Sequence, residues 1–255
     1  MRMDTTGRCF LGLFTLSAVS ALSAGLTAQV VRPSETRSTP MEIVCGPMAT
    51  ITAPAQTVKV IGGTERVKAM FATGETILIN AGTTEGIRAG QHFYVRRVIE
   101  DRFAANAADV RPKSLHTAGW VTIVETQSHV SVATIKEACD GVQEGDYLEP
   151  LVLPDPAQPV ADGVPDFARP GRVLLGDDRR QLGATGSMMV IDRGTDHGVR
   201  AGQKLTIFRD TVDGTGPVVT IGDAVVVSTQ AESSLMKIQH SREAIQVGDK
   251  VAIHR

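Results

Sequence analysis

Three residues with metal-ligating or acid–base side chains lie close together in the sequence: Asp192, Asp196 and His197. Carboxylates and an imidazole are the side chains that hold metal ions such as Zn²⁺ or transfer protons in catalysis. The same sequence pattern occurs once earlier in the chain, where the corresponding residues are Asn80, Thr84 and Glu85. The repetition keeps the glycines but not the ligand set, so the pattern favours a solvated turn over a metal site.

Most of the usual linear signatures of catalysis are missing from the sequence. It has no GxSxG, HExxH or P-loop motif, and no GxGxxG between a strand and a helix. We therefore predict no catalytic residue, no metal and no cofactor. One alternative stays open, because an enzyme or accessory subunit with a site divided between two domains leaves no linear signature. That alternative predicts that the Asp192, Asp196 and His197 side chains meet a residue of the other domain around a pocket.

The motif Arg-Ala-Gly-Gln is repeated in full, at residues 88–91 and 200–203. In a structural interpretation, Arg88 and Arg200 bond turn carbonyls or cover the end of a barrel, and Gln91 and Gln203 begin a strand. In a functional interpretation, the motif contacts a polymer or a partner protein twice. The structural interpretation is the simpler one, and the four residues are retained as candidate binding residues.

A second set of candidates lies in residues 98–118, where the first copy of the pattern carries nine extra residues. Long loops on a rigid scaffold commonly carry binding functions. The basic and aromatic side chains that would make the contact are Arg102, Phe103, Arg111 and Lys113. A mobile excursion without a function is the competing interpretation.

The elements that position these residues come from an internal duplication. Residues 74–97 and 186–209 are identical at ten of twenty-four positions, and a second block beginning at Gly119 matches one beginning at Gly222. Each copy contains short apolar runs that alternate in period two and end at glycine turns, which is typical of β-strands. We predict an all-β protein with two tandem small β-barrels of SH3-like or OB-like type.

The composition places the domain boundaries. Residues 150–170 are rich in proline and poor in large apolar side chains, which predicts an extended, semi-rigid linker. The first barrel is expected over residues 58–149 and the second over residues 171–255. Residues 29–57 form an N-terminal extension that is tied to the first barrel.

The N-terminus has the pattern of an export signal. Arg2 and Arg8 precede an apolar stretch of small residues, and we predict a signal peptide over residues 1–28. An uncleaved anchor is the alternative. Signal removal leaves Cys45 and Cys139, which we expect to form a disulfide because such bonds persist outside the cytoplasm. Two separate buried thiols are the alternative. The protein is therefore expected to be periplasmic or secreted, with no membrane span after cleavage.

The charge and aromatic content exclude nucleic acid as a partner. The chain of 255 residues has a net charge of −2, which becomes −3 when the signal is removed, and only 4% of its residues are aromatic. Nucleic-acid binding needs a basic surface, and single-strand binding needs aromatic stacking platforms.

The repeated line of glycines, with Gly82, Gly86 and Gly90 before a strand and a terminal Gly-Asp pair, resembles two exported bacterial β modules. One is the C-terminal barrel of flagellar assembly protein T and related modules that accompany LysM domains. The other, more distant, is the β domain of rod-shape-determining protein C. Departures include Gln91 and Gln203, which stand where such modules commonly carry Asp. The resemblance implies a noncatalytic envelope scaffold or interaction protein in a peptidoglycan- or flagellum-associated assembly, whose partner is an envelope protein or peptidoglycan.

Overall fold

The computed structural model describes residues 38–64, 68–107, 110–153, 160, 163–211 and 216–255. The predicted signal peptide lies outside these residues. Strands dominate the fold, as the sequence predicts. Among the described residues, the helical elements are one short α-helix, α1 (Pro40–Cys45), and three single 3₁₀ turns, η1 to η3. In the described part of the chain, no helix has the length and apolar character needed to cross a membrane.

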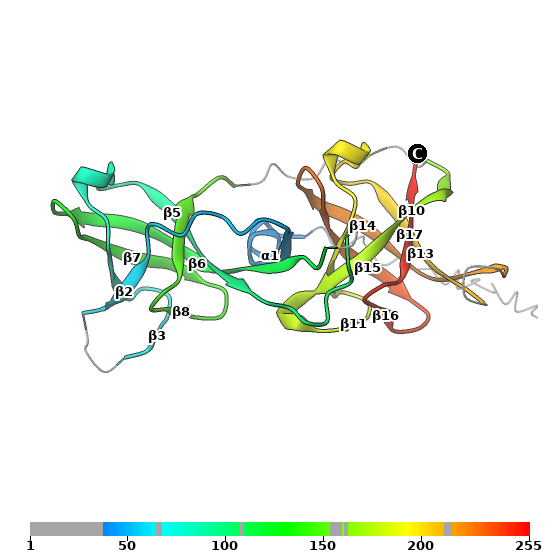
Figure 1. Ribbon diagram of the computed structural model, residues 1–255, viewed down its shortest axis with the longest axis horizontal. Helices are drawn as coiled ribbons and strands as arrows, with labels where there is room; N and C mark the ends of the chain where they lie inside the picture. Colours follow the sequence, from blue (N-terminus) through cyan, green and yellow to red (C-terminus); the bar gives the residue numbers. More distant parts are fainter. Residues whose placement is uncertain (1–37, 65–67, 108–109, 154–159, 161–162, 212–215) are drawn as a thin grey trace, which may run out of the picture. The chain divides into compact units, whose positions relative to one another are not determined.

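The first repeat forms a seven-stranded sheet in the order β2-β4-β7-β6-β5-β9, with β1 paired to β6 (Figure 1). A separate pair, β3 with β8, lies beside it. The elements of this half are β1 (Met48–Thr50), β2 (Val60–Gly63), β3 (Met70–Phe71), β4 (Thr76–Ile79), η1 (Thr83–Glu85), β5 (His92–Ile99), β6 (Lys113–Thr126), β7 (Ser131–Ala138), β8 (Val142–Gln143) and β9 (Tyr147–Pro150).

The second repeat is a closed six-stranded barrel in the order β10-β12-β15-β14-β13-β17, and β11 pairs with β16. Its strand order matches that of the first sheet position by position, which is the structural counterpart of the sequence duplication. The elements of this half are β10 (Pro165–Gly176), η2 (Asp177–Arg179), β11 (Leu182–Gly183), β12 (Met188–Ile191), η3 (Thr195–His197), β13 (Lys204–Asp210), β14 (Val218–Thr229), β15 (Ser234–Ser241), β16 (Ile245–Gln246) and β17 (Lys250–His254).

The prediction of a closed barrel is confirmed for the second repeat, and the first repeat differs from it. In the barrel, β10 begins at Pro165, inside the stretch for which the sequence predicts a linker, and pairs with β17 on both sides of a bulge. In the first repeat the strand begins only at Val60. It approaches β9 through backbone hydrogen bonds, such as Val60 N–H to Asp146 O at 2.8 Å, and a single bridge between Lys59 and Tyr147. Because its first strand is shorter, this sheet lacks a continuous β2–β9 pairing and does not close into a barrel.

Each repeat has its own apolar interior, built from the inward-facing residues of its strands. The repeated glycines fix the turns that connect these strands. A side chain on Gly82 or Gly194 would collide with a backbone carbonyl, because a Cβ there would lie 2.1 Å from Gln127 O or 2.2 Å from Gln230 O. Gly86 and Gly198 end the following 3₁₀ turns in the left-handed conformation, at φ 83° and 75°, which glycine adopts at little cost.

Candidate functional site

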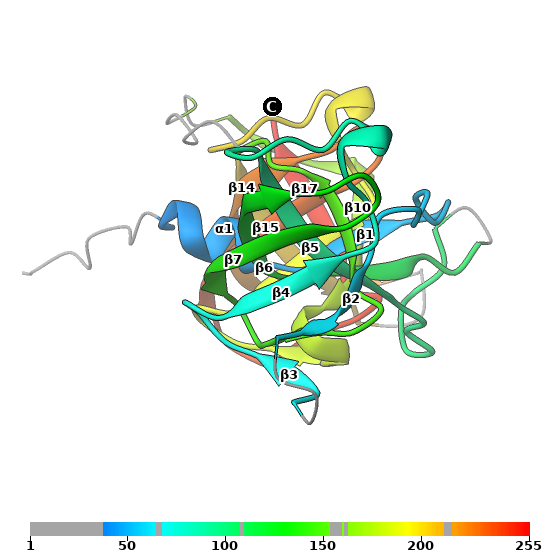
Figure 2. The same ribbon diagram turned by 90° about the vertical axis from the view of Figure 1, so that its left-hand side faces the viewer.

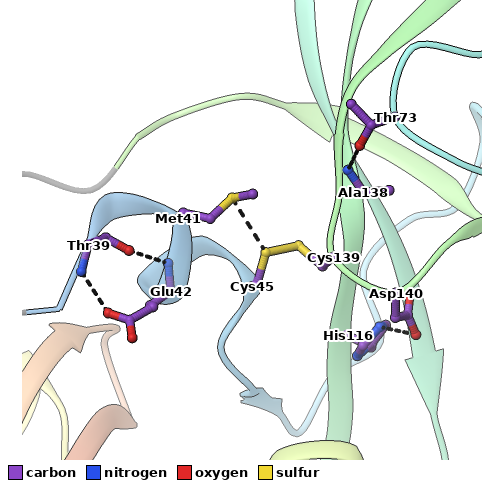
Figure 3. Close-up of a disulfide and its surroundings, with 9 residues drawn as sticks. All are labelled: Thr39, Met41, Glu42, Cys45, Thr73, His116, Ala138, Cys139 and Asp140. Atoms are coloured by element: carbon purple, nitrogen blue, oxygen red, sulfur yellow. Dashed lines mark hydrogen bonds and ion pairs between the residues drawn. A yellow bond between two sulfur atoms is a disulfide. The ribbon is translucent and has the colours of Figure 1, made fainter.

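The N-terminal segment, residues 38–52, is joined covalently to the first sheet. Cys45 at the end of α1 and Cys139 just after β7 form a disulfide with their Cα atoms 5.6 Å apart, which confirms the predicted pair (Figure 3). Thr39 and Glu42 cap the helix reciprocally: Glu42 N–H donates to Thr39 Oγ1, and Thr39 N–H donates to Glu42 Oε2. This bond to the Thr39 backbone is the largest cause that lowers the pKa of Glu42. The disulfide and the helix cap thus fix the conformation of this segment and its attachment to the first sheet.

The same segment packs on the outer surface of the barrel. Ile43 and Ala49 belong to a third buried apolar cluster that has no counterpart among the interiors of the two repeats. A Cβ on Gly46 would lie 2.6 Å from Leu235 Cδ2, so the helix end approaches β15 closely. Lys237 Nζ lies 3.2 Å from Glu42 Oε1. The segment therefore connects the two repeats, covalently on one side and by packing on the other.

The predicted recognition loop also contacts the barrel. β5 extends to Ile99 and β6 begins at Lys113, so the connection is residues 100–112, shorter than the 98–118 predicted. Ala104 is buried in the third apolar cluster, which also contains Ile43 and Ala49, and Ala105 N–H donates to Leu174 O at 2.7 Å. The sequence could not show this because the contact is between the two repeats. The part of the insertion around Ala104 and Ala105 therefore packs against the barrel.

The four candidate residues of this insertion differ in their availability. Arg102, Phe103 and Arg111 are exposed. Lys113 is partly buried and pairs with Glu100, with Nζ 2.7 Å from Oε1. The first three are available to a partner, whereas Lys113 stabilises the base of the hairpin.

The candidate metal ligands lie beside a cavity of about 460 Å³. Residues 49–52 of the N-terminal segment form one side, and the residues after β12 and the β14–β15 turn form the other. Asp192, Asp196 and His197 all line it. The three residues thus line one cavity together with the N-terminal segment and with Ala107 and Pro112 of the first repeat.

Their polar atoms, however, are directed to different local partners. Asp192 accepts a hydrogen bond from Arg172 N–H at 2.6 Å and pairs with Arg193. Gly194 N–H donates to His197 Nδ1 at 3.3 Å. Asp196 is exposed. The described residues contain no cluster of three or more potential ligands that could hold a metal ion, and the arrangement resembles a capped turn more than a catalytic group.

A second cavity, of about 360 Å³, opens on the other side of the N-terminal segment. Glu42 and Cys45 line it together with Asp177 and Arg180 of the barrel. Burial raises the pKa of the Asp177 carboxyl, although the nearby His116 and Arg180 act in the opposite direction. Asp177 is partly buried, whereas residues 178–180 are exposed.

The repeated Arg-Ala-Gly-Gln motif has the same geometry in both copies. Gln91 Oε1 accepts a hydrogen bond from Arg88 N–H at 2.9 Å, and Gln203 Oε1 accepts one from Arg200 N–H at 3.0 Å. The glutamines therefore close the turns. Both arginines are exposed, and their guanidinium groups form no hydrogen bond or ion pair with any residue that the structure describes. Each glutamine directly precedes a strand, β5 or β13, and neither arginine side chain bonds a turn carbonyl among the described residues.

One duplicated pair was not singled out from the sequence. Arg97 forms a bidentate ion pair with buried Asp146, at 2.7 and 2.8 Å. Arg209 forms the same pair with Asp249, at 2.6 and 2.7 Å. The hydrogen bonds to these carboxylates raise the pKa of both arginines. Arginine and aspartate are retained at these positions in both repeats, and this retention was the sequence signal that could have revealed the pair.

A further polar group occurs in the first repeat alone. Arg96 stacks over the Tyr94 ring, 4.4 Å from its centroid, and pairs with Glu149 at 2.6 Å. Burial raises the pKa of Tyr94 and of the nearby Tyr147. The tyrosines are therefore protonated at neutral pH, and the group stabilises the β5–β9 edge.

No family model matches the sequence, and no curated protein does.

Proposed function

We propose that the protein is an exported, noncatalytic envelope protein that binds peptidoglycan, an anionic polymer, through Arg88 and Arg200. Its location is the periplasm or the outside of the cell. The predicted signal peptide supports export, and so does the disulfide, since such bonds are rare in the cytoplasm. The observation that carries the proposal is the pair of exposed, unpaired arginines at equivalent turns of the two repeats.

The turn geometry suits these arginines to binding. A side chain that already pairs within the protein must lose that partner before it meets a ligand, and neither guanidinium has one among the described residues. The glutamine bond fixes the backbone from which each arginine projects. Guanidinium groups bind carboxylates in a bidentate manner, and the peptide stems of peptidoglycan carry carboxylates at regular intervals. Two contacts on one polymer strengthen each other because the second is made at a high effective concentration.

Co-sedimentation of the mature protein with purified sacculi tests this proposal. A single exposed ion pair contributes at most about 1 kcal/mol, so R88A or R200A should weaken binding by about two- to fivefold. The double variant should lose about the product of the two single losses, about tenfold or more, because it removes both contacts. Arg242→Ala is the matched control, since Arg242 is equally exposed and lies on the β15–β16 connection.

Binding that is unchanged in the double variant would contradict the role of the arginines. Failure of the wild-type protein to pellet would favour an envelope protein as the partner instead. Crosslinking from exposed Phe103 would then capture it.

A second candidate is an envelope enzyme, or an accessory subunit of one. The cavity shared by Asp192, Asp196 and His197 with residues 49–52 favours it. This candidate predicts that the protein releases soluble fragments from sacculi and that D196N abolishes the release. Intact sacculi after prolonged incubation would exclude this activity.

A further inference from the structure

The cavity of about 460 Å³ beside Asp196 has an extended backbone segment as one wall. Residues 49–52 line it one after another. Successive side chains of an extended segment point to opposite faces, so an unbroken run of residues lines a cavity along the edge of its backbone. β1, which is labelled in Figure 2, pairs with β6 and with no other described strand. Its second edge is therefore open, and the cavity lies along it.

The backbone N–H groups of Ile51 and Thr52 on this wall are free to donate hydrogen bonds. The two residues follow β1 directly and are exposed, and neither N–H has an acceptor among the residues that the structure describes. Thr50 Oγ1 donates to Thr52 O at 2.6 Å, which holds the shape of the segment. An open edge with free backbone groups is the kind of surface to which an extended peptide adds as a further strand.

The opposite wall carries two carboxylates that have no partner. Asp196 and Glu232 both line the cavity, and both are exposed. Asp196 N–H donates to Ala231 O at 3.0 Å, so the two acidic residues lie at neighbouring positions where their turns meet. Neither carboxylate forms a hydrogen bond or an ion pair within the described part of the chain. The third acidic residue of the cavity, Asp192, differs from them because it pairs with Arg193.

The first repeat shows the same two turns with their charge neutralised inside the protein. Glu85 stands at the position of His197, and His129 stands at the position of Glu232. Glu85 caps its 3₁₀ turn and also pairs with His129, at 2.9 Å between Oε1 and Nδ1. In the barrel, His197 caps the turn through Nδ1, and Glu232 is left without a partner. The exchange of the two residue types therefore opens a carboxylate beside the cavity.

We propose that this cavity binds an extended peptide segment that carries a basic side chain. Carbonyl oxygens of the peptide accept hydrogen bonds from the N–H groups of Ile51 and Thr52. Its ammonium or guanidinium group pairs with Asp196 and Glu232, since charge-assisted hydrogen bonds to carboxylates are the strong ones. The volume lies within the range of about 300–1,000 Å³ that is typical of ligand pockets.

The two walls together favour a peptide over a free cation. A small amine would leave the N–H groups of Ile51 and Thr52 without an acceptor, whereas a peptide supplies the carbonyl oxygens. Leu174 and Pro112 add apolar lining, which suits the uncharged part of a peptide. Neither of the repeated arginines, at positions 88 and 200, lines this cavity. The inference therefore goes beyond the proposed peptidoglycan contact and does not depend on it.

Fluorescence anisotropy with a labelled pentapeptide amide of alternating valine and arginine tests the proposal. The mature, oxidised protein is titrated over about 1–500 µM, where weak peptide complexes populate. We expect saturable binding that is absent when glutamate replaces arginine in the peptide. D196N and E232Q should each weaken binding about two- to fivefold, as the loss of one exposed ion pair does. E144Q is the matched control, since Glu144 is equally exposed and does not line the cavity.

The double variant H197E/E232H makes the test independent of folding defects. It gives the barrel the arrangement that the first repeat already has, in which the carboxylate caps the turn and pairs with the histidine. We expect it to fold and to bind the peptide as weakly as E232Q. Wild-type protein that does not bind the basic peptide at 500 µM overturns the proposal. Equal binding by wild type and H197E/E232H overturns it as well.

Competition by putrescine, a diamine with two positive charges and no carbonyl group, tests the role of the backbone. We expect putrescine to displace the peptide only at concentrations at least about tenfold above those of the unlabelled peptide, because it leaves the N–H groups of Ile51 and Thr52 unpaired. Displacement by putrescine and by the unlabelled peptide at equal concentrations would mean that the cavity recognises a cation alone, and it would overturn the assignment of a peptide.

Discussion

Removal of the Cys45–Cys139 bond should destabilise the first repeat by about 4–5 kcal/mol. The bond spans 94 residues, and the chain-entropy model gives about 4.7 kcal/mol at 25 °C for a loop of about this length. The free energy arises mainly in the unfolded chain, because in the folded protein α1 is also fixed by its cap and by packing on the barrel. We expect the C45A/C139A variant to fold and to unfold at lower urea.

The single tryptophan makes this prediction measurable for the first repeat by itself. Trp120 lies in β6, inside the disulfide loop, and the barrel contains no tryptophan or tyrosine. With a urea m-value of about 2–3 kcal/mol/M, the fluorescence midpoint should fall by about 1.5–2.5 M. Wild-type protein in a reducing agent should match the variant, and the variant should not respond to that agent.

Two results would refute the reasoning. A midpoint that moves by less than about 0.5 M would show that the loop constraint contributes little to stability. A wild-type midpoint that ignores the reducing agent would show that the two cysteines are not bonded in the protein.

The remaining predictions concern buried charges. Asp146→Ala and Asp249→Ala should each cost about 3 kcal/mol or more in urea unfolding, because each leaves an arginine without the carboxylate to which it donates two hydrogen bonds. Glu144→Ala, at an exposed site of the turn before Asp146, is the control. Equal small losses in all three variants would argue against the duplicated pair. Asp177→Asn should raise the melting temperature at pH 7 but not at pH 3. The reason is that a carboxyl whose folded pKa is raised contributes stability below its unfolded pKa and loses it as the pH rises through the folded pKa. If D177N changed the melting temperature equally at pH 3 and pH 7, burial of the Asp177 charge could not be the cause of the change.

Much of the fold was readable from local patterns. The alternating residues of β7 and the short apolar runs of β4 and β12 follow from the periods of strands, and the glycines mark the turns between them. The duplication then assigns one strand order to both repeats. Closure of the first sheet was not readable, because it depends on how far the strand before Val60 extends.

The contacts between the repeats were the part that the sequence hid. The insertion has the composition of an exposed loop, yet Ala104 is buried because the barrel offers an apolar outer face to receive it. Leu174, Val190 and Leu235 form that face. They lie next to other apolar residues in the sequence, so they cannot be distinguished there from residues of the barrel interior. In the same way, the distance between Arg97 and Asp146 in the sequence concealed a bidentate pair that only the sheet brings together.

The affinity of the mature protein for purified sacculi, measured as a function of salt for the wild type and the R88A/R200A variant, tests the proposed function most directly. The account predicts salt-sensitive binding by the wild type, since exposed charges are screened. It also predicts a loss of about tenfold or more, together with a weaker salt dependence, in the double variant. Equal binding and equal salt dependence of the two proteins would contradict it.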